Sequence, residues 1–377
     1  MKKLFCILLP LIVCMLSACD SKNHDSKPNI EFIIDSRIKT TPVKDQGRST
    51  LCWIYAMLAT IESDRLMIGD SVNLSADYLA RMMLSNKATQ THFSQRPPSM
   101  RGMMTMTPQL MEQYGMMPYD SYHADKPANY MAIARKMAKL GRIRSSISTM
   151  QANVDDLLDR EIGYLPYHIY MLGAEYSPQE FAHSIYQPEE WQAITSFTHH
   201  PYGEEFEMET PDNIMHDRFL NVPLDTMMTY IVRSLSQGIP VCWEGDISEK
   251  GFDMERGIAT LDNENANNND ATTNAAALRQ KAFELRSTTD DHCMALVGLA
   301  HDKQGKRYII AKNSWGAIGR YHGYIFMSEQ YIKMKTIAVM VKKEICVNHG
   351  LSLFRQNNSS FLHSFQWNNS SKACLSA

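Results

Sequence analysis

Residues 42–70 read PVKDQGRSTLCWIYAMLATIESDRLMIGD, and this stretch decides the fold of the chain. It begins with a polar turn around Gln46 and continues as an apolar run with helical spacing, which predicts a helix over residues 51–68. Cys52 opens that helix. Unpaired N–H groups at the start of a helix carry partial positive charge, which lowers the pKa of a nearby thiol. The sequence therefore predicts a nucleophilic thiolate at Cys52.

A thiolate that attacks a carbonyl also needs an oxyanion donor and a base. Gln46 lies six residues before Cys52, so its side-chain amide can reach the same carbonyl as the Cys52 backbone N–H. His292 precedes one predicted strand and Asn313 follows the next, which places them side by side on adjacent strands. Asn313 would accept from one imidazole nitrogen and fix the tautomer that faces the thiol. Trp315 is expected to shield this pair from water.

The remaining pattern divides the chain into a helical half and a sheet half. Further helices are expected over residues 76–84 and 108–114 and within 127–200. After about residue 220 the pattern changes to short β-type runs. These runs cover residues 239–243, 294–298, 307–311, 323–327 and 337–341, with an Asn-rich loop at 262–274 and a helix at 275–286.

Four motifs carry a family resemblance. They are residues 42–47 (PVKDQG), Cys52 with Trp53, Asp291 with His292, and residues 312–316 (KNSWG), in that order along the chain. Together they resemble the papain superfamily of cysteine peptidases, which uses a Cys-His-Asn arrangement. Taken singly, each motif has a plain structural interpretation, such as a small buried cysteine or a turn. Their joint occurrence in this order, together with Gln46, favours the catalytic interpretation.

Within the superfamily the chain is most similar to the bleomycin hydrolase or aminopeptidase C branch. This finer resemblance is carried by residues 177–181 (SPQEF), 219–223 (FLNVP) and 288–292 (TTDDH), and it covers about residues 35–343. It implies an α+β, papain-like fold, in which a helical domain packs on a β-barrel-like antiparallel sheet domain with the active-site cleft between them. It also implies peptide substrates and an acyl-enzyme, with no cofactor and no metal ion.

The resemblance implies a role for each site residue. Cys52 would be the nucleophile, His292 the general base and acid, Asn313 the residue that orients His292, and Gln46 the oxyanion donor. Three further residues would contact substrate: Gly102, Cys293 and Trp315. Cys293 would line the pocket for the second substrate residue upstream of the cut, and we expect a moderate apolar preference there.

The chain departs from the family pattern beside the nucleophile and at the cleft edge. Thr50 and Leu51 replace smaller residues, and this bulkier pair would narrow the approach to the oxyanion hole. Arg101 stands where the family has glycine, and it would add a charge at the edge of the cleft. The pairing function of Gly102 with the substrate backbone would remain.

Aminopeptidase action is a hypothesis at this stage. In the bleomycin hydrolase branch the carboxyl end of the chain enters the cleft and restricts cutting to free amino termini. Residues 346–377 do not match that ending, and they are expected to form a disordered tail outside the fold. Two alternatives stay open: a catalytically idle papain-like lipoprotein that binds peptides, and a papain-like acyltransferase or amidase.

The amino terminus resembles a bacterial lipoprotein signal. Residues 1–19 read MKKLFCILLPLIVCMLSAC, a charged start followed by an apolar run too short to span a bilayer and by small residues before Cys19. Cleavage before Cys19 and lipidation of its sulfur would anchor the chain to a membrane of the bacterial cell envelope, on the periplasmic or the cell-surface face. The expected segments are therefore a signal peptide at 1–18, the lipidated cysteine and tether at 19–34, the helical part at 35–220, the β-rich part at 221–345 and the tail at 346–377.

Composition excludes several other classes of protein. Thirty-eight basic against 41 acidic residues give a net charge of -3 without a basic patch, so nucleic acid is not expected as a partner. Oligomer formation stays open. Eight cysteines are too few for a disulfide scaffold, and once Cys52 is assigned to catalysis none of Cys242, Cys293, Cys346 and Cys374 needs a partner. The pair His199-His200 is interpreted as structural.

Overall fold

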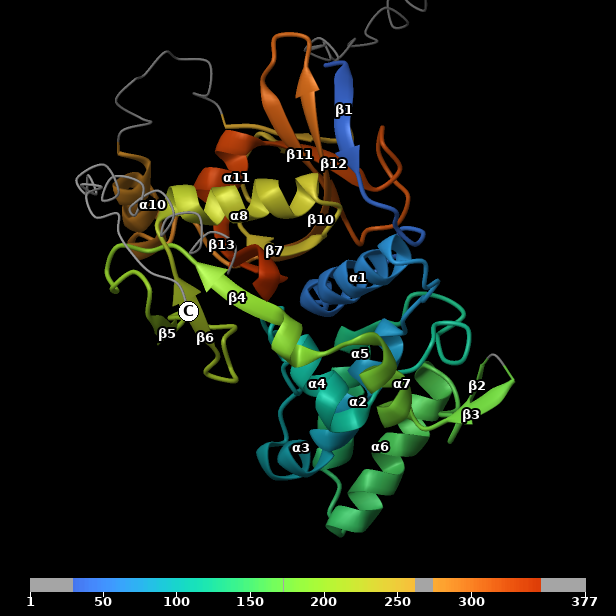
Figure 1. Cartoon of the computed structure of the whole chain (residues 1–377). Coiled ribbons are helices and arrows are strands. Elements are labelled where there is room, and N and C mark those ends of the chain that lie inside the picture. The colour runs from blue at the N-terminus through green and yellow to red at the C-terminus, as the bar shows by residue number, and fades with distance from the viewer. Residues whose placement is uncertain (1–29, 172, 262–273, 347–377) are drawn as a thin grey trace, which may run out of the picture.

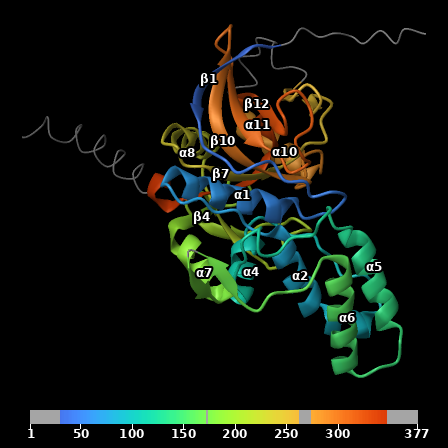
Figure 2. The same ribbon diagram turned by 90° about the vertical axis from the view of Figure 1, so that its right-hand side faces the viewer.

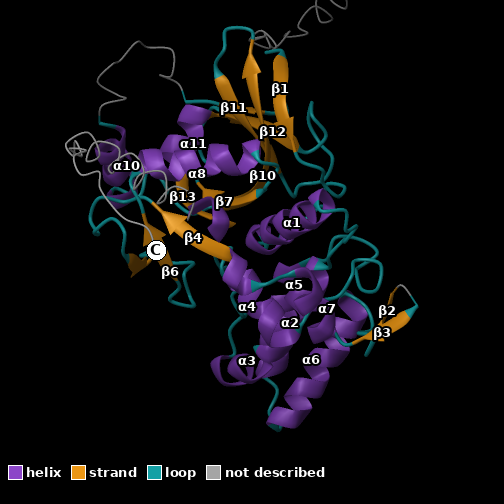
Figure 3. Cartoon of the chain, viewed as in Figure 1, coloured by secondary structure: helices purple, strands orange, loops and turns teal. Residues whose placement is uncertain are grey.

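The computed structural model describes residues 30–171, 173–261 and 274–346. One lobe is mostly helical and the other contains the large sheet together with further helices, with helix α1 (Cys52–Met67) between them (Figures 1 and 2). Colouring by secondary structure shows helices in both lobes and the large sheet in one of them (Figure 3). The α+β, papain-like fold class expected from the sequence is confirmed by the structural relatives described below.

The helical lobe follows α1 along the chain. Its helices are α2 (Ala76–Asn86), α3 (Ala88–Ser94), α4 (Met106–Tyr114), α5 (Tyr130–Gly141), α6 (Ile147–Glu161) and α7 (Pro178–Ile185). A two-stranded hairpin, β2 (Ile169–Met171) and β3 (Ala174–Tyr176), lies at its edge. The predicted helices over 51–68, 76–84 and 108–114 correspond to α1, α2 and α4.

The other lobe is built on one eleven-stranded sheet with the strand order β5-β6-β4-β13-β7-β10-β11-β12-β9-β8, and β1 pairs with β10 outside this path. The strands are β1 (Phe32–Arg37), β4 (Trp191–Thr195), β5 (Glu205–Glu207), β6 (Arg218–Asn221), β7 (Val241–Gly245), β8 (Phe252–Asp253), β9 (Ile258–Ala259), β10 (His292–Asp302), β11 (Arg307–Lys312), β12 (Tyr324–Ser328) and β13 (Thr336–Lys342). Helices α8 (Leu224–Ser236), α10 (Ala275–Glu284) and α11 (Glu329–Lys335) pack around this sheet, and a short 3-10 turn (Pro188–Glu190) precedes β4.

Two details of the sheet differ from the expectation of an antiparallel, barrel-like domain. The pairs β4–β6 and β12–β9 are parallel, so the sheet is mixed. Within the described residues the strand path is open, running from β5 to β8, and no closed barrel forms. Each of the five predicted β-type runs overlaps a strand of this sheet.

The strands also extend beyond the predicted β-rich part. Phe32–Arg37, of which the first residues were assigned to the tether, form β1 and pair with the distal half of β10. Strands β4 and β5 lie before residue 221 and β6 ends at it, yet all three continue the large sheet through β13. The chain thus returns to the sheet lobe before the boundary that composition suggested.

Helix α1 is the element that holds the two lobes together. Its residues from Trp53 to Ser63 are all buried, as expected for a helix surrounded by protein on every side. It packs against β7 and β10 on the sheet side and against α2 and α4 on the helical side. Cys52, at its first turn, therefore lies where the two lobes meet.

Candidate active site

Cys52 is the first residue of α1 and is half-buried. The residue before it, Leu51, caps the helix without a side-chain hydrogen bond, while its carbonyl accepts from the backbone N–H groups of Ile54 and Tyr55. The positive end of the helix dipole is thus directed at the thiol. The backbone N–H of Cys52 has no partner among the described residues, so it is free to donate to a ligand.

His292 and Asn313 form a hydrogen-bonded pair on neighbouring strands. His292 begins β10, Asn313 follows β11, and His292 Nε2 lies 2.8 Å from Asn313 Oδ1. The same Oδ1 accepts from the backbone N–H of Ser314 at 2.7 Å, which identifies it as the amide oxygen. Because an amide oxygen only accepts, Nε2 carries the proton and Nδ1 is the free nitrogen of the neutral ring.

Trp315 covers this pair, as the sequence predicts. Its ring centroid lies 4.8 Å from that of His292. His292 and Asn313 are 4% and 2% exposed, so the pair is shielded from bulk water. A buried hydrogen bond between them fixes the imidazole orientation more firmly than one in solvent would.

Gln46 is hydrogen-bonded to Ser314, in the loop that follows β11 and carries Asn313 and Trp315. Its backbone N–H donates to the carbonyl of Ser314 at 2.8 Å, and its Oε1 accepts from Ser314 Oγ at 2.6 Å. These contacts orient the amide so that Nε2 donates one proton to the carbonyl of Ser49 at 3.0 Å. The second Nε2 proton stays available to a ligand, because a primary amide has two donors.

A cavity of about 460 Å³ brings the predicted residues together. All of the predicted site residues in the described chain except Asn313 line it: Gln46, Cys52, Gly102, His292, Cys293 and Trp315. Asn313 lies behind His292, as an orienting residue should. Cys19, the predicted lipidation site, lies outside the described residues.

Of the departures from the family pattern, the bulkier pair beside the nucleophile has a limited effect on this cavity. Thr50 lines it, but Leu51 is fully buried in the hydrophobic core and does not narrow the approach. Gly102 is needed for close packing, since a Cβ there would lie 2.9 Å from Met106 Sδ and 3.2 Å from the Trp53 ring. Arg101 does reach the cavity, where its Nε donates to both carboxylate oxygens of Asp212 at 2.7 and 2.9 Å.

The environment of Cys52 favours its thiolate. Its pKa is lowered well below the ordinary value, first by a hydrogen bond from the Cys293 thiol and then by the hydrogen bond and charge of His292, against the opposing effect of burial. Burial raises the pKa of Cys293 instead, and the neighbouring Cys52 and Glu244 act in the same direction. Of the two thiols, Cys52 is therefore the reactive one.

Sequence reasoning missed the acidic side of the cavity. Asp212, Glu244, Asp290 and Asp291 all line it. In the sequence, Asp290 and Asp291 stand out only as part of the motif at residues 288–292, and Glu244 comes directly after a predicted strand. The alternation of side chains along a strand could have indicated Glu244. Cys242 packs in the core cluster that contains α1, and Trp243 packs in the cluster on the opposite face of the sheet. Residue 244 is therefore expected on the same face as Cys242, towards α1. The expected apolar preference beside Cys293 stays a prediction.

A network of buried charges ties the Gln46 loop to α1. Glu62, which is fully buried in α1, accepts from Thr41 Oγ1, Lys44 Nζ and the backbone N–H of Leu74. Lys312 donates to the same Thr41 hydroxyl at 2.9 Å. The loop before Gln46, helix α1 and the end of β11 are thereby held in one arrangement.

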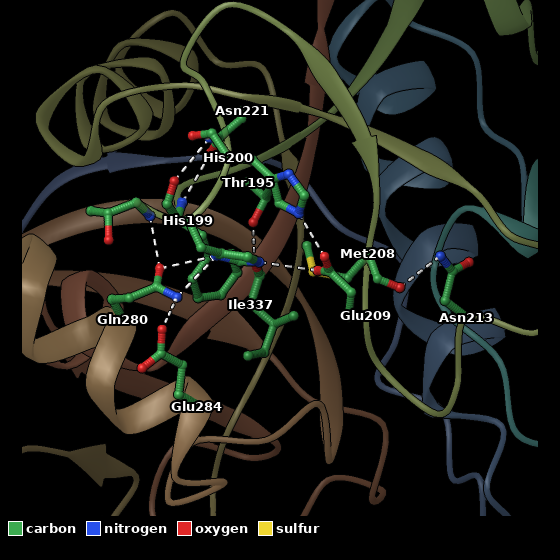
Figure 4. Close-up of polar contacts among 12 residues, drawn as sticks. Thr195, His199, His200, Met208, Glu209, Asn213, Asn221, Gln280, Glu284 and Ile337 are labelled. Carbon is green, nitrogen blue, oxygen red and sulfur yellow. Dashed lines mark hydrogen bonds and ion pairs between the residues drawn. The ribbon is translucent and has the colours of Figure 1, made fainter.

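His199, His200 and Glu209 form the group of described residues that could hold a metal ion, with their ligand atoms within 4.8 Å of one another. Figure 4 shows both imidazoles directed at the Glu209 carboxylate. Gln280 orients His199, and its own amide is fixed by Thr198 and Glu284. With Gln280 donating to His199 Nδ1, the ring donates to Glu209, so the contacts are complete without an ion. This fits the structural interpretation of the histidine pair.

In the part of the chain that the structure covers, none of the helices has the length and apolar character needed to cross a membrane.

A Cys-His-Asn arrangement at the junction of a helical and a sheet lobe defines a papain-like cysteine peptidase, and comparisons with known proteins agree. The model of the peptidase C1-like family matches residues 169–367, and the chain belongs to that family. It is 22% identical to aminopeptidase G of Lactobacillus delbrueckii subsp. lactis over 381 residues, covering 86% of each chain. It is 23% identical to aminopeptidase C of the same organism over 384 residues, covering 86% of this chain and 84% of that protein.

A solved structure supports the fold. The crystal structure of PepW from Lactobacillus rhamnosis superposes with a TM-score of 0.60 at 18% sequence identity, covering 83% of this chain and 82% of that one. The protein is thus a papain-like cysteine peptidase.

Proposed function

We propose that the protein is an aminopeptidase that cleaves through a thioester acyl-enzyme, with Cys52 as nucleophile. The observation that carries this proposal is the cavity in which the Cys52 thiol, the His292 ring and the Gln46 amide face a common space. Aminopeptidase specificity is supported by the two relatives named aminopeptidase G and aminopeptidase C.

In the proposed mechanism, His292 Nδ1 takes the proton of the Cys52 thiol, and the resulting thiolate attacks the carbonyl carbon of the first peptide bond. The negative charge on the carbonyl oxygen is held by the free Nε2 proton of Gln46 and the backbone N–H of Cys52. His292, oriented by Asn313, protonates the leaving amine from Nδ1. A water molecule, deprotonated by the same nitrogen, then hydrolyses the thioester and restores the thiolate.

The test compares an aminoacyl amide that has a free amino group with its N-acetylated counterpart. An aminopeptidase cleaves the free form far faster, and equal rates would contradict the aminopeptidase proposal while leaving the peptidase class intact. Adding an amine nucleophile and analysing the products separates hydrolysis from acyl transfer. Labelling of Cys52 by a thiol-reactive peptide epoxide separates an active enzyme from an idle binding protein.

We also propose that the mature chain is a lipoprotein of the bacterial cell envelope, anchored through Cys19. The support is the order of charged, apolar and small residues before Cys19 in the sequence. Membrane fractionation of cells that express the full chain tests it.

A further inference from the structure

Glu244 is a buried carboxylate at the wall of the catalytic cavity. It is 2% exposed, lies near the end of the central strand β7, and pairs in register with Cys293 of β10. One oxygen, Oε2, accepts from the backbone N–H of Met104 at 3.2 Å. Its other oxygen has no hydrogen-bond partner among the described residues, and neither oxygen is paired with a cation there. Glu244 thus carries an acceptor into the cavity that the fold itself does not use.

Asp290 is a second acidic residue that lines the same cavity and has an unpaired oxygen. Its Oδ2 is buried and has no hydrogen-bond partner in the described structure. Asp212 differs, because Arg101 neutralises it with two hydrogen bonds. Burial raises the pKa of Glu244 well above its ordinary value, and repulsion from Asp290 acts in the same direction. Glu244 therefore has no positive partner among the described residues, whereas Asp290 keeps the nearby charge of Arg101 and a hydrogen bond from Thr210.

An uncompensated buried carboxylate is unfavourable unless something binds it. A fold that places Glu244 beside a nucleophile, with Asp290 lining the same cavity, can accept a positively charged ligand group there. We propose that Glu244, with Asp290, binds a primary ammonium group of the substrate. The inference rests on the aminopeptidase function proposed above and specifies how the substrate would be recognised.

The position of Glu244 favours the α-ammonium of the substrate residue under attack. The Cys293 thiol contacts Cys52, and Glu244 is the register partner of Cys293, about 5 Å away between Cα atoms. The α-ammonium of an amino-terminal residue is two bonds from the carbonyl carbon that Cys52 attacks. A lysine side chain at the second residue upstream of the cut would carry the same chemistry into this space, and the experiment separates the two sources.

The experiment measures kcat and KM of the full-length protein and its variants on two pairs of fluorogenic amides. The first pair is alanine amide with a free amino group and acetylalanine amide. The second is acetyl-Lys-Ala amide and acetyl-norleucine-Ala amide, which differ in the side-chain ammonium. The variants are Glu244→Gln and Asp290→Asn, and the control is Glu112→Gln, an exposed acid outside the cavity.

If the α-ammonium is bound, Glu244→Gln raises KM for the free-amine substrate tenfold or more and changes kcat and the acetylated substrates less than twofold. Asp290→Asn raises KM for the free-amine substrate by a smaller factor, and Glu112→Gln leaves this KM unchanged. Equal effects on free and acetylated substrates, or no effect on either, would overturn the proposal. Wild-type protein that cleaves both alanine substrates equally contradicts the aminopeptidase proposal alone. In that case a Glu244→Gln variant that loses cleavage of acetyl-Lys-Ala amide, but not of acetyl-norleucine-Ala amide, still supports the ammonium site. A variant without this selective loss overturns the ammonium site.

A binding measurement makes the result independent of turnover. In the Cys52→Ala background, alaninamide should raise the melting temperature and acetylalaninamide should not. Adding Glu244→Gln should remove that increase. A temperature shift that is the same for both ligands, or that persists in the double variant, contradicts the site.

Discussion

The Cys293 thiol is the neighbour whose hydrogen bond lowers the pKa of Cys52 most. We predict that Cys293→Ala raises the pKa of Cys52, whereas Cys293→Ser, which keeps a donor, changes it less. In the Cys293→Ala variant a smaller fraction of Cys52 would then be ionised at low pH. The measurement is the rate of iodoacetamide alkylation of Cys52 between pH 4 and 9, followed by mass spectrometry. An alanine variant with the same pH profile as wild type would contradict this role.

Asp290 makes the native state less stable where it is ionised. Its pKa is raised from 3.8 to about 6, first by burial and next by Asp212, so the native state holds the proton more tightly than the unfolded state. The free-energy cost of ionising Asp290 in the native state is absent below pH 3.8 and complete above about pH 6. Asp290→Asn should therefore stabilise the protein by about 2 kcal/mol at pH 8 and by little near pH 4.

Urea unfolding at the two pH values checks this prediction. Asp212→Asn is the matched control, because it removes the carboxylate that Arg101 binds and should destabilise instead. Stabilisation of similar size by Asp290→Asn at both pH values would show that charge is not the cause. The same substitution is predicted above to weaken substrate binding, so stability and function would oppose each other at this residue.

The presence of Cys52, His292 and Asn313 at one site could be predicted from the sequence because each belongs to a motif with its own spacing, and their catalytic roles stay a prediction. Cys52 follows a Gln-Gly turn, and His292 and Asn313 flank successive β-type runs. Glu244 could not be predicted in the same way. Its significance depends on which strand pairs with β7 and in which register, and that is a property of the assembled sheet.

At the scale of elements, the charge network under α1 holds the Gln46 loop in place. Glu62→Gln removes the anion and leaves Lys44 and Lys312 close together, with Lys312 buried and its pKa already lowered to about 8 by burial. Loss of one partner of a buried ion pair typically costs about 3 to 5 kcal/mol. We predict destabilisation of about 3 kcal/mol and a lower kcat, because the loop that carries Gln46 loses its attachment.

Thermal unfolding and kinetics on the free-amine substrate measure the two effects. Glu329→Gln, which breaks the exposed pair with Arg307, serves as the control and should change stability by less than about 1 kcal/mol. A Glu62→Gln variant that is destabilised but keeps full kcat would show that the network supports the fold without positioning Gln46.

Elements with a strong internal pattern could be predicted, and those that depend on distant partners could not. Helix α1 and the runs that form β7, β10, β11, β12 and β13 stand out in the sequence. Strand β1 does not, because its isoleucines Ile33 and Ile34 are exposed and give it no buried apolar face. Its position is set by pairing with β10 and by the stacking of Phe32 on Phe326, with ring centroids 4.0 Å apart. Strands β4 to β6 likewise depend on their pairing with β13 and with one another.

At the scale of the whole molecule, strand β10 links the amino-terminal end to the catalytic cavity. Its first residue, His292, lies at the cavity, whereas its last residue, Asp302, pairs with Phe32 at the start of β1. Ten residues of extended strand span about 33 Å. The polypeptide that comes from Cys19 therefore joins the folded part far from the cavity, and an anchor there would leave the cleft accessible to substrates.

This arrangement predicts that anchoring and catalysis are separable. Cys19→Ser should move the full-length protein from the membrane fraction of expressing cells to the soluble fraction, because the acceptor sulfur is lost. Its kcat and KM on the free-amine alanine substrate should stay within twofold of wild type, since β1 still fixes the sheet lobe. Cys374→Ser, which lies outside the described residues, is the control for loss of a thiol. Unchanged membrane association of the Cys19 variant would contradict the lipid anchor, and a large change in KM would show that the anchor affects the cavity after all.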